Sequence, residues 1–299
     1  MTIDISSLPA PEVIEPVSYD TILADMLADL IARDATLANL LPSDPAYKIL
    51  EVCAYREAVK SQEYNDRTKG LLLAFATGGN LDHIGVTYFR TQRLEIDPGD
   101  PSAVPPVPPT YESDTDYLER LLRAESAYST AGPVDAYIYH AQSADGNVKD
   151  ISVTSPSAVS VVVAVLSHTG DGTADAGLLS IIDTALADDV RPLTDLVTVQ
   201  SAVILPYTIN TTLTTYPGLD QETVRLASLA SVTTWVDKMH RLGRDITLSG
   251  LTAAHMVDGV MDVTFNNTIG TDITANKVIS ATEAAYCTGI TITAGLIDE

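Results

Sequence analysis

Basic residues, cysteines and long apolar runs are scarce in this 299-residue sequence. Seventeen Lys and Arg stand against 40 Asp and Glu, so the formal net charge is -23. A surface of this sign repels phosphate groups, which argues against nucleic-acid binding and against anionic membranes. The two cysteines, Cys53 and Cys287, lie far apart and indicate neither a disulfide framework nor a cysteine zinc site. The simplest interpretation is two small apolar side chains in a reducing compartment.

The sequence also lacks the pattern of an export signal or a membrane span. Residues 1–16 carry Asp4, Glu12 and Glu15 but no basic residue, unlike a signal peptide. The longest clean apolar runs, at 71–76 and 161–166, are short compared with the roughly 20 residues that a spanning helix needs. We therefore predict a soluble chain that is made without classical export.

The order of patterns along the chain predicts an α+β fold, in which an N-terminal helical region precedes two small mixed-sheet α+β units. Residues 1–17 contain three prolines and little periodicity, so we expect an extended arm. Residues 18–96 are predicted to form a helical N-terminal domain. Six of the 16 prolines fall in 97–110, which we interpret as a stiff, extended linker; a ligand for a polyproline reader is the alternative. A central α+β domain over 111–201 and a C-terminal α+β domain over 202–299 complete the prediction.

Two amphipathic helices are predicted in the helical domain. The first covers 18–41, where apolar residues recur at spacings of three and four. The second begins after Asp44, whose carboxylate is expected to accept hydrogen bonds from the first turn, with Pro45 at the first helical position. This helix is predicted to run to about Thr68, with a continuation through 71–76 as the alternative. Glycine adopts the left-handed conformation at low cost, so Gly78 and Gly79 are expected to close the helical run.

Strands and helices alternate in the rest of the chain. Ser113 is expected to begin a helix, with Asp116 three residues later as a weak capping box. The run at 158–166 is almost continuously apolar, as in a central strand that is buried on both faces. Further strands are predicted at 148–155, 196–201, 203–215, 260–265 and 290–293, and further helices near 133–143, 176–186, 220–242 and 248–256.

One pattern occurs twice in the α+β region. Residues 141–153 and residues 254–265 each read as a helix end, an Asp-Gly turn and a strand that begins with Val-x-Asp. Two similar α+β units would explain the repetition, and chance similarity of turn chemistry is the alternative.

The loop at 170–175 is the most tempting ligand site, because it follows a strand and precedes a helix as a dinucleotide-binding loop does. Asp175 stands where that motif has its third glycine, and its carboxylate would compete with a pyrophosphate for the helix N-terminus. We interpret Asp175 as a helix cap. A calcium site on Asp171 and Asp175 would lack its remaining oxygen ligands, so a surface turn is preferred.

The remaining polar residues form no recognisable catalytic or metal motif. The five histidines are scattered, and none forms an HExxH pair. His140 and His255 each stand near a helix end, where an imidazole can bond the last carbonyls. A nucleophile elbow and a phosphate-binding loop are missing as well. We therefore predict no catalytic residue, no cofactor, no metal and no enzymatic activity.

A series of short stretches between about residues 18 and 295 carries a family resemblance. Gly78-Gly-Asn-Leu-Asp-His-Ile-Gly85 is similar to a Gly-x-x-Leu-Asp-x-Leu-Gly segment, and residues 117–120 are followed by Gly132-Pro133. Further stretches are 148–153, 161–165, 191–195, 242–246 and 285–293. In their order and spacing they resemble the baseplate J-like wedge proteins of contractile phage tails, and the Pro-rich stretch departs from that pattern.

The resemblance implies a structural role with defined partners. Such proteins are baseplate subunits: two copies join a third wedge protein, and the wedges close into a six-fold ring around the hub. The ring changes conformation on host contact and triggers sheath contraction. By this resemblance we expect a homodimer within a heteromeric wedge, next to a hub or sheath-initiating protein, in the virion tail baseplate. Production and assembly are expected in the host cytoplasm.

Two apolar helix stripes are the predicted assembly interface, because a switching ring needs broad contacts between chains. The alternative is that each stripe covers the core of its own domain. The acidic surface keeps free subunits apart and favours a partner with a basic face. The predicted interface residues are Ile22, Leu23, Met26 and Leu30 in the first helix, and Val232, Trp235, Val236 and Met239 in the helix at 220–242.

Two other functions remain open from the sequence. A soluble α+β enzyme with a dispersed, unrecognised active site would show a deep pocket that holds residues with shifted pKa values. A receptor-binding or carbohydrate-binding tail protein would show exposed aromatic residues on a β-rich tip. The one tryptophan, Trp235, lies in a predicted helix stripe, which argues against the second of these functions.

Overall fold

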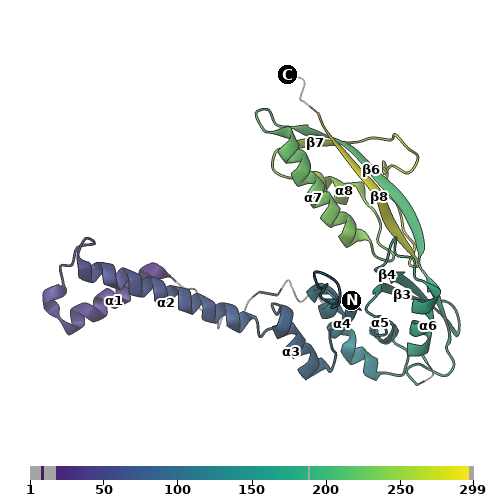
Figure 1. The fold of residues 1–299 in the computed structure, drawn as a ribbon, viewed down its shortest axis with the longest axis horizontal. Helices are drawn as coiled ribbons and strands as arrows, with labels where there is room; N and C mark the ends of the chain where they lie inside the picture. The colour runs from purple at the N-terminus through teal and green to yellow at the C-terminus, as the bar shows by residue number, and fades with distance from the viewer. Residues whose placement is uncertain (1–7, 10–17, 188, 296–299) are drawn as a thin grey trace. The chain divides into compact units, whose positions relative to one another are not determined.

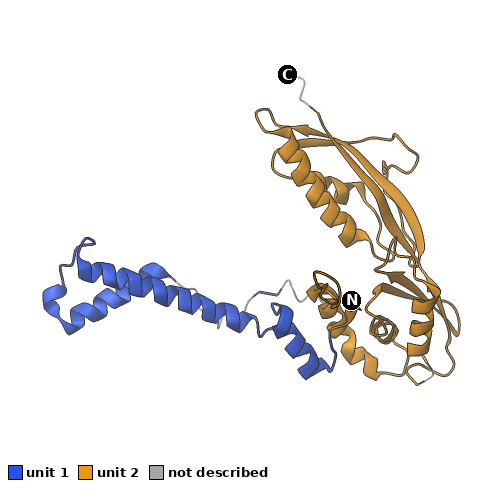
Figure 2. Ribbon diagram, viewed as in Figure 1, with its two compact units in different colours: residues 1–92 blue, residues 93–299 orange. Residues whose placement is uncertain are grey.

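The architecture is described from a computed structural model of the chain (Figure 1). The structure describes residues 8–9, 18–187 and 189–295, so nearly all of the predicted N-terminal arm lies outside the described residues. The chain forms two compact units, residues 1–92 and residues 93–299 (Figure 2). The described part of the first unit is helical and the second is α+β, which confirms the predicted fold class. The finer division into five segments stays a prediction.

The helical unit begins with α1 (Tyr19–Arg33), which starts where the sequence predicted. The Ser18 hydroxyl caps it by accepting a hydrogen bond from the first turn at 3.4 Å. The prediction that this helix covers 18–41 is wrong. Asp34 adopts an extended conformation and its carboxylate accepts a main-chain bond two residues later, which caps a separate 3₁₀ turn, Ala35–Leu37.

The second helix, α2 (Pro45–Lys69), packs against α1 and carries its proline at the first position, as predicted. The expected side-chain cap is absent from Asp44. Its carboxylate instead accepts the main-chain N–H of Leu41 at 2.8 Å and closes the preceding turn. α2 ends at Lys69, next to the end near Thr68 that the sequence predicted, and the alternative continuation through 71–76 does not occur.

The glycine pair at 78–79 opens the next helix, α3 (Gly78–Phe89), instead of closing the previous one. Gly78 has a φ of +51°, a left-handed conformation that suits the entry into a helix as well as the exit from one. Arg90 then ends α3, also in the left-handed region. Position along the chain, and not residue type alone, therefore decides which role a glycine takes.

The Pro-rich stretch folds back on itself, where an extended connector was expected. β1 (Glu95–Asp97) and β2 (Thr110–Tyr111) lie at its two ends and pair antiparallel. Between them, Asp100 and Val107 each donate a main-chain hydrogen bond to the other at 2.9 Å. Proline has no N–H to donate, so pairing is confined to the few positions between prolines.

The first large sheet and its helices are formed by α4 (Asp114–Arg123), a 3₁₀ turn (Ala124–Tyr128), α5 (Val134–Gln142), β3 (Val148–Ser157), β4 (Ser160–Ser167), α6 (Ala176–Ala185) and β5 (Leu196–Ser201). The sheet is mixed, with the predicted apolar strand β4 at its centre. β3 pairs antiparallel with one edge of β4, and β5 pairs parallel with the other edge. α5 and α6 share one core with this sheet. Ser113 caps α4 and Asp175 caps α6, both as predicted.

The second large sheet is built around β6 (Val203–Thr215), with β7 (Val260–Phe265) antiparallel on one edge and β8 (Glu283–Gly295) parallel on the other. α7 (Gln221–Met239) and α8 (Leu248–His255) lie along one face of this sheet (Figure 1). The last strand is much longer than the predicted 290–293, because it pairs with almost the whole length of β6.

The two sheets share an arrangement that explains the repeated sequence pattern. In each, a helix leads through an Asp-Gly turn into the edge strand that runs antiparallel to the central strand; these pairs are α5–β3 and α8–β7. The other edge strand runs parallel to the centre in both. The chain order differs, since β4 follows β3 whereas β6 precedes β7. The similarity therefore lies in the spatial arrangement and not in the connectivity.

Candidate functional site

The predicted interface residues of α1 lie on the side of the helix that is shielded from water. Leu23 is buried, with 8% of its surface exposed, and Ile22, Met26 and Leu30 are half-buried. Since α1 packs against α2, this stripe serves first to hold the helical pair together. An additional role in assembly between chains stays a prediction.

The predicted interface residues of α7 belong to the core of the second large sheet. Val232 is completely buried, and Trp235, Val236 and Met239 pack against the same apolar cluster. They therefore cover their own sheet, which is the intramolecular alternative considered for the sequence. Their participation in assembly stays a prediction as well.

Sequence reasoning missed a second apolar face on α2. Ile49, Val52, Tyr55 and Val59 are between 40% and 64% exposed, and we call these four residues the α2 stripe. Their spacing of three and four residues places them on one side of the helix, opposite the buried Ala54. Large apolar side chains gathered on one exposed helix face are typical of protein interfaces. The spacing was visible in the sequence, but nothing there distinguished this face from the one that packs on α1.

The charges of the helical pair are arranged asymmetrically. α2 contains five basic and four acidic residues, a formal charge of +1 in a chain of charge -23. Arg56 and Lys60 are exposed beside the α2 stripe. α1 instead exposes three carboxylates, those of Asp20, Asp25 and Asp29. The same unit therefore presents a basic, apolar side and an acidic side.

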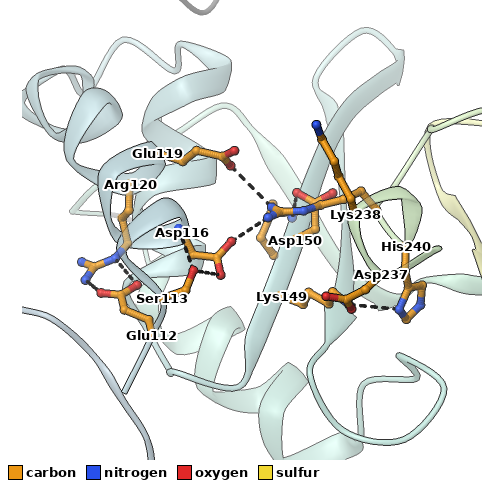
Figure 3. A network of polar contacts seen from close by, with 12 residues as sticks. Glu112, Ser113, Asp116, Glu119, Arg120, Lys149, Asp150, Asp237, Lys238 and His240 are labelled. Carbon is orange, nitrogen blue, oxygen red and sulfur yellow. Dashed lines mark hydrogen bonds and ion pairs between the residues drawn. The ribbon is translucent and has the colours of Figure 1, made fainter. Parts of the chain in front are cut away.

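A charged clamp joins the two large sheets of the second unit (Figure 3). Arg241, just after α7, donates to the carboxylate of Asp116 at 2.6 Å and to that of Glu119 at 3.4 Å, both on α4. The other carboxylate oxygen of Asp116 accepts the hydroxyl of Ser113 at 2.7 Å, the cap of α4. The helix cap thereby fixes the carboxylate that receives the arginine.

Three further contacts, made by Lys149 and Asp150, cross the same boundary. The Lys149 ammonium on β3 donates to the carboxylate of Asp237 on α7 at 3.2 Å, and lies 3.2 Å from Nδ1 of His240. Asp150 accepts the main-chain N–H of Leu242 at 2.9 Å. We refer to the contacts made by Arg241, Lys149 and Asp150 as the polar junction.

The surroundings of the polar junction shift several pKa values. Burial acts to lower the pKa of Arg241, but the carboxylates of Glu119, Asp116 and Asp150 more than offset it, so this pKa is raised. Burial raises the pKa of Asp150 and lowers the pKa of His240. Arg241 therefore stays charged, while the neutral form of His240 is favoured.

A second ion pair beside the polar junction is almost completely buried. Arg120 donates through two nitrogens to the two carboxylate oxygens of Glu112, and one of these bonds measures 3.3 Å. Glu112 also accepts the main-chain N–H of Leu94 at 2.9 Å, and Arg120 donates to Ser143 at 3.3 Å. The cavity here measures about 20 Å³, which is room for about one water molecule. The arrangement suits the holding of elements better than the binding of a ligand.

The polar junction could not be found from the sequence. Lys149 and its partner Asp237 are 88 residues apart in the sequence, and Arg241 and Asp116 are 125 residues apart. Single acidic residues on helices looked like an ordinary solvated surface. Asp150 alone carried a signal, because it belongs to the repeated Val-x-Asp pattern.

The other residues considered in the sequence have structural surroundings. His255 is fully buried, with its Nδ1 3.0 Å from the Ser228 hydroxyl, and burial lowers its pKa to about 4. Asp171 accepts the main-chain N–H of Thr173 at 3.0 Å, as expected for a turn. Among the described residues, no group of three or more His, Cys, Asp or Glu is placed to hold a metal ion. None of the helices in the described ranges is long and apolar enough to cross a membrane.

Comparison with known proteins identifies the family. A family model described as the baseplate J-like N-terminal domain matches residues 42–100, and one described as the baseplate J-like central domain matches residues 129–201. The chain is 44% identical over 305 residues to baseplate protein J of Escherichia phage P2, with 99% of each chain covered. The chain belongs to the baseplate J-like family. This confirms the resemblance seen in the sequence and supports a structural role in a phage tail baseplate.

Among solved structures, the chain matches one in the cryo-EM structure of the anti-feeding prophage baseplate, symmetrised six-fold. The match has 13% sequence identity and a TM-score of 0.41, and covers 61% of this chain and 44% of that chain. The family assignment depends on the matching models and on the P2 relative.

Proposed function

We propose that this baseplate J-like chain is a structural subunit of the wedge in a contractile phage tail baseplate. It pairs with a second copy, joins other wedge proteins and forms a six-fold ring around the hub, next to a hub or sheath-initiating protein. The ring changes conformation and triggers sheath contraction. The chain is made and assembled in the host cytoplasm and contacts neither nucleic acid nor membrane. Membership of the baseplate J-like family supports the baseplate role.

The observation that carries the proposal is the exposed α2 stripe. Full burial of one large apolar side chain contributes about 1.5–3 kcal/mol, and these four residues are each about half exposed. Covering them in an assembly would therefore contribute on the order of 4 kcal/mol before the costs of association. A helix that keeps this surface free in the single chain is suited to take up another chain there.

The charges of the helical unit support pairing between copies. Exposed Arg56 and Lys60 border the α2 stripe, whereas α1 exposes Asp25 and Asp29. Two copies can therefore bring a basic side against an acidic side. Such complementarity favours one orientation over others and speeds association. It also lets an acidic chain overcome its general self-repulsion at a specific contact.

The second unit supports the conformational part of the proposal. Each large sheet has its own apolar core. Among the described residues, the apolar cluster at their boundary is small: Leu166, Ala202 and Ala284 are buried in it, and Ile204 and Leu242 pack against them. The polar junction adds charged contacts at the same boundary. A small boundary of mixed apolar and polar contacts between two separately packed cores is the kind along which domains move.

The test compares two double variants in infectious phage. Val52→Glu with Val59→Glu places charges in the α2 stripe, and glutamate is at least as good a helix former as valine. The matched control, Ala227→Glu with Ala230→Glu, adds the same charge at exposed helical positions of α7, outside the helical unit. We expect the purified stripe variant to melt like the parent, while phage carrying it lose most of their titre and their tails lack baseplates in electron micrographs. Normal baseplates on phage with the stripe variant would refute the assembly role of α2.

A further inference from the structure

A pocket of about 210 Å³ opens on the first large sheet and shares no lining residue with the polar junction. Four valines contribute to its apolar lining: Val134 from the start of α5, Val153 from β3, Val159 from the turn before β4, and Val161 from β4. Val134 and Val159 are 53% and 57% exposed, so part of this apolar surface meets water in the single chain.

One carboxylate, that of Asp195, lines the same pocket. It accepts the hydroxyl of Tyr137 at 2.6 Å through one oxygen, while its other oxygen, as far as the described residues go, receives a single 3.4 Å contact from the Thr194 hydroxyl. Arg191 donates to the main-chain oxygen of Asp195 at 2.6 Å. Gly132 also closes in, because a Cβ there would lie 3.4 Å from this carboxylate. The carboxylate is thus held in place, with one oxygen still able to accept a stronger hydrogen bond.

The hairpin that borders the pocket contains a residue in an unfavourable conformation. Val159 has a φ of +70°, a region that β-branched residues rarely adopt and that asparagine or glycine would tolerate better. Its main-chain oxygen accepts the N–H of Leu196 at 2.7 Å, which holds this conformation. Strain of this kind tends to persist where the side chain has a task other than stability. Here the valine side chain adds apolar surface at the pocket.

We propose that the pocket receives a lysine or arginine side chain from another protein chain. The valines suit the aliphatic stem of such a residue, and the Asp195 carboxylate suits its cationic head. The two ends of the given sequence do not supply this group: residues 1–17 contain no basic side chain, and neither do residues 296–299. The exposed Arg56 and Lys60 of this chain are assigned above to the contact between copies, and the chain as a whole is strongly acidic, so the occupant that we propose is a basic segment of a different protein.

Methyl-detected NMR titration of the full chain tests this directly. The probe is N-acetyl-lysine methylamide, and the control is N-acetyl-norleucine methylamide, which has the same stem without the ammonium group. We expect saturable shifts of the Val134, Val153, Val159 and Val161 methyl groups with the lysine probe, and at least threefold weaker binding of the norleucine probe. Equal binding of the two probes, or no saturable shift, would overturn the proposal.

Two variants separate the carboxylate from the apolar wall. Asp195→Asn keeps an oxygen for the Tyr137 hydroxyl but removes the charge, and should weaken lysine-probe binding about fivefold. Val159→Asn suits the left-handed backbone, so the chain should fold normally while the probe binds more weakly. Unchanged affinity in both variants would contradict the assignment of the pocket.

The partner contact rests on the proposed baseplate function, whereas the titration does not. Phage with Asp195→Asn should give fewer complete baseplates than the parent. If this variant loses probe binding while its phage assemble normally, the pocket is no partner contact and the wedge proposal stands. If the α2 stripe variant assembles normally while Asp195→Asn does not, the stripe proposal fails and the pocket proposal stands.

Discussion

Removing the charge of Arg241 should loosen the boundary between the two large sheets. The substitution Arg241→Met keeps most of the stem but removes the guanidinium that bridges to Asp116 and Glu119. Two unit charges about 4 Å apart interact by about 4 kcal/mol at an effective dielectric constant near 20. Asp116 is 26% exposed and Glu119 is 41% exposed, so water compensates part of the loss. We therefore expect a loss of about 2–3 kcal/mol.

Calorimetry and hydrogen exchange measure this loss. For a unit of about 200 residues, 2–3 kcal/mol corresponds to a fall in Tm of roughly 4–12 °C. The amide of Leu242, which donates to Asp150 across the boundary, should exchange faster in the variant. A double-mutant cycle with Asp116→Asn isolates the energy of the pair.

The matched control for Arg241 is Arg225→Met. Arg225 pairs with Glu222 at 2.6 Å on the surface of α7, where Glu222 is 60% exposed. Exposed pairs of this kind contribute less than about 1 kcal/mol. If Arg241→Met lowers stability no more than Arg225→Met, or if the cycle gives no coupling with Asp116, the clamp does not hold the boundary.

Three further outcomes follow from single residues. Folding lowers the pKa of His255 from an ordinary value of 6.5 to about 4. The neutral, buried imidazole therefore contributes at most about 3 kcal/mol to the free energy of unfolding; this contribution is complete above pH 6.5 and disappears as the pH falls to 4. In His255→Gln, the stability measured by urea unfolding should depend less on pH over this range, and an equally steep pH dependence would contradict the reasoning. Gly146→Ala should lower the free energy of unfolding by about 1–3 kcal/mol, because the added Cβ meets the main chain of β1. Gly79 has open space around it, so Gly79→Ala should leave stability unchanged. Thermal unfolding of the two variants measures the difference, and equal effects would contradict the close approach at Gly146. Cys53 is exposed on α2 beside the α2 stripe, so maleimide should label it in the free chain and not in purified tails; equal labelling would argue against a covered α2.

Local chemistry made much of the fold predictable. Ser113 and Asp175 were recognised as caps because their side chains precede apolar helical patterns, and both accept the expected main-chain bonds. The central position of β4 followed from its nearly continuous apolar run. The end of α1 at Asp34 was missed, because the apolar spacing continues past it into a 3₁₀ turn. The hydrogen bond that the Asp34 carboxylate accepts separates this turn from α1. The length of β8 was missed because β6, a strand remote in sequence, determines it.

The candidate site was predictable only in part, for the same reason. Spacing along one helix finds apolar stripes, but it cannot tell which stripe a neighbouring element covers. The stripe with Val232 and Trp235 lies in a core, whereas the exposed stripe with Val52 and Val59 lies on the helix to which we assigned no interface. The contacts of Arg241 join residues more than a hundred positions apart, and no local pattern reports such a pair.

Cryo-electron microscopy of purified tails tests the central claim most directly, since it shows what the exposed face of α2 contacts. The account predicts density for this chain in a ring at the baseplate, with Ile49, Val52, Tyr55 and Val59 covered by another chain. A baseplate in which these four side chains face water on every copy would contradict it.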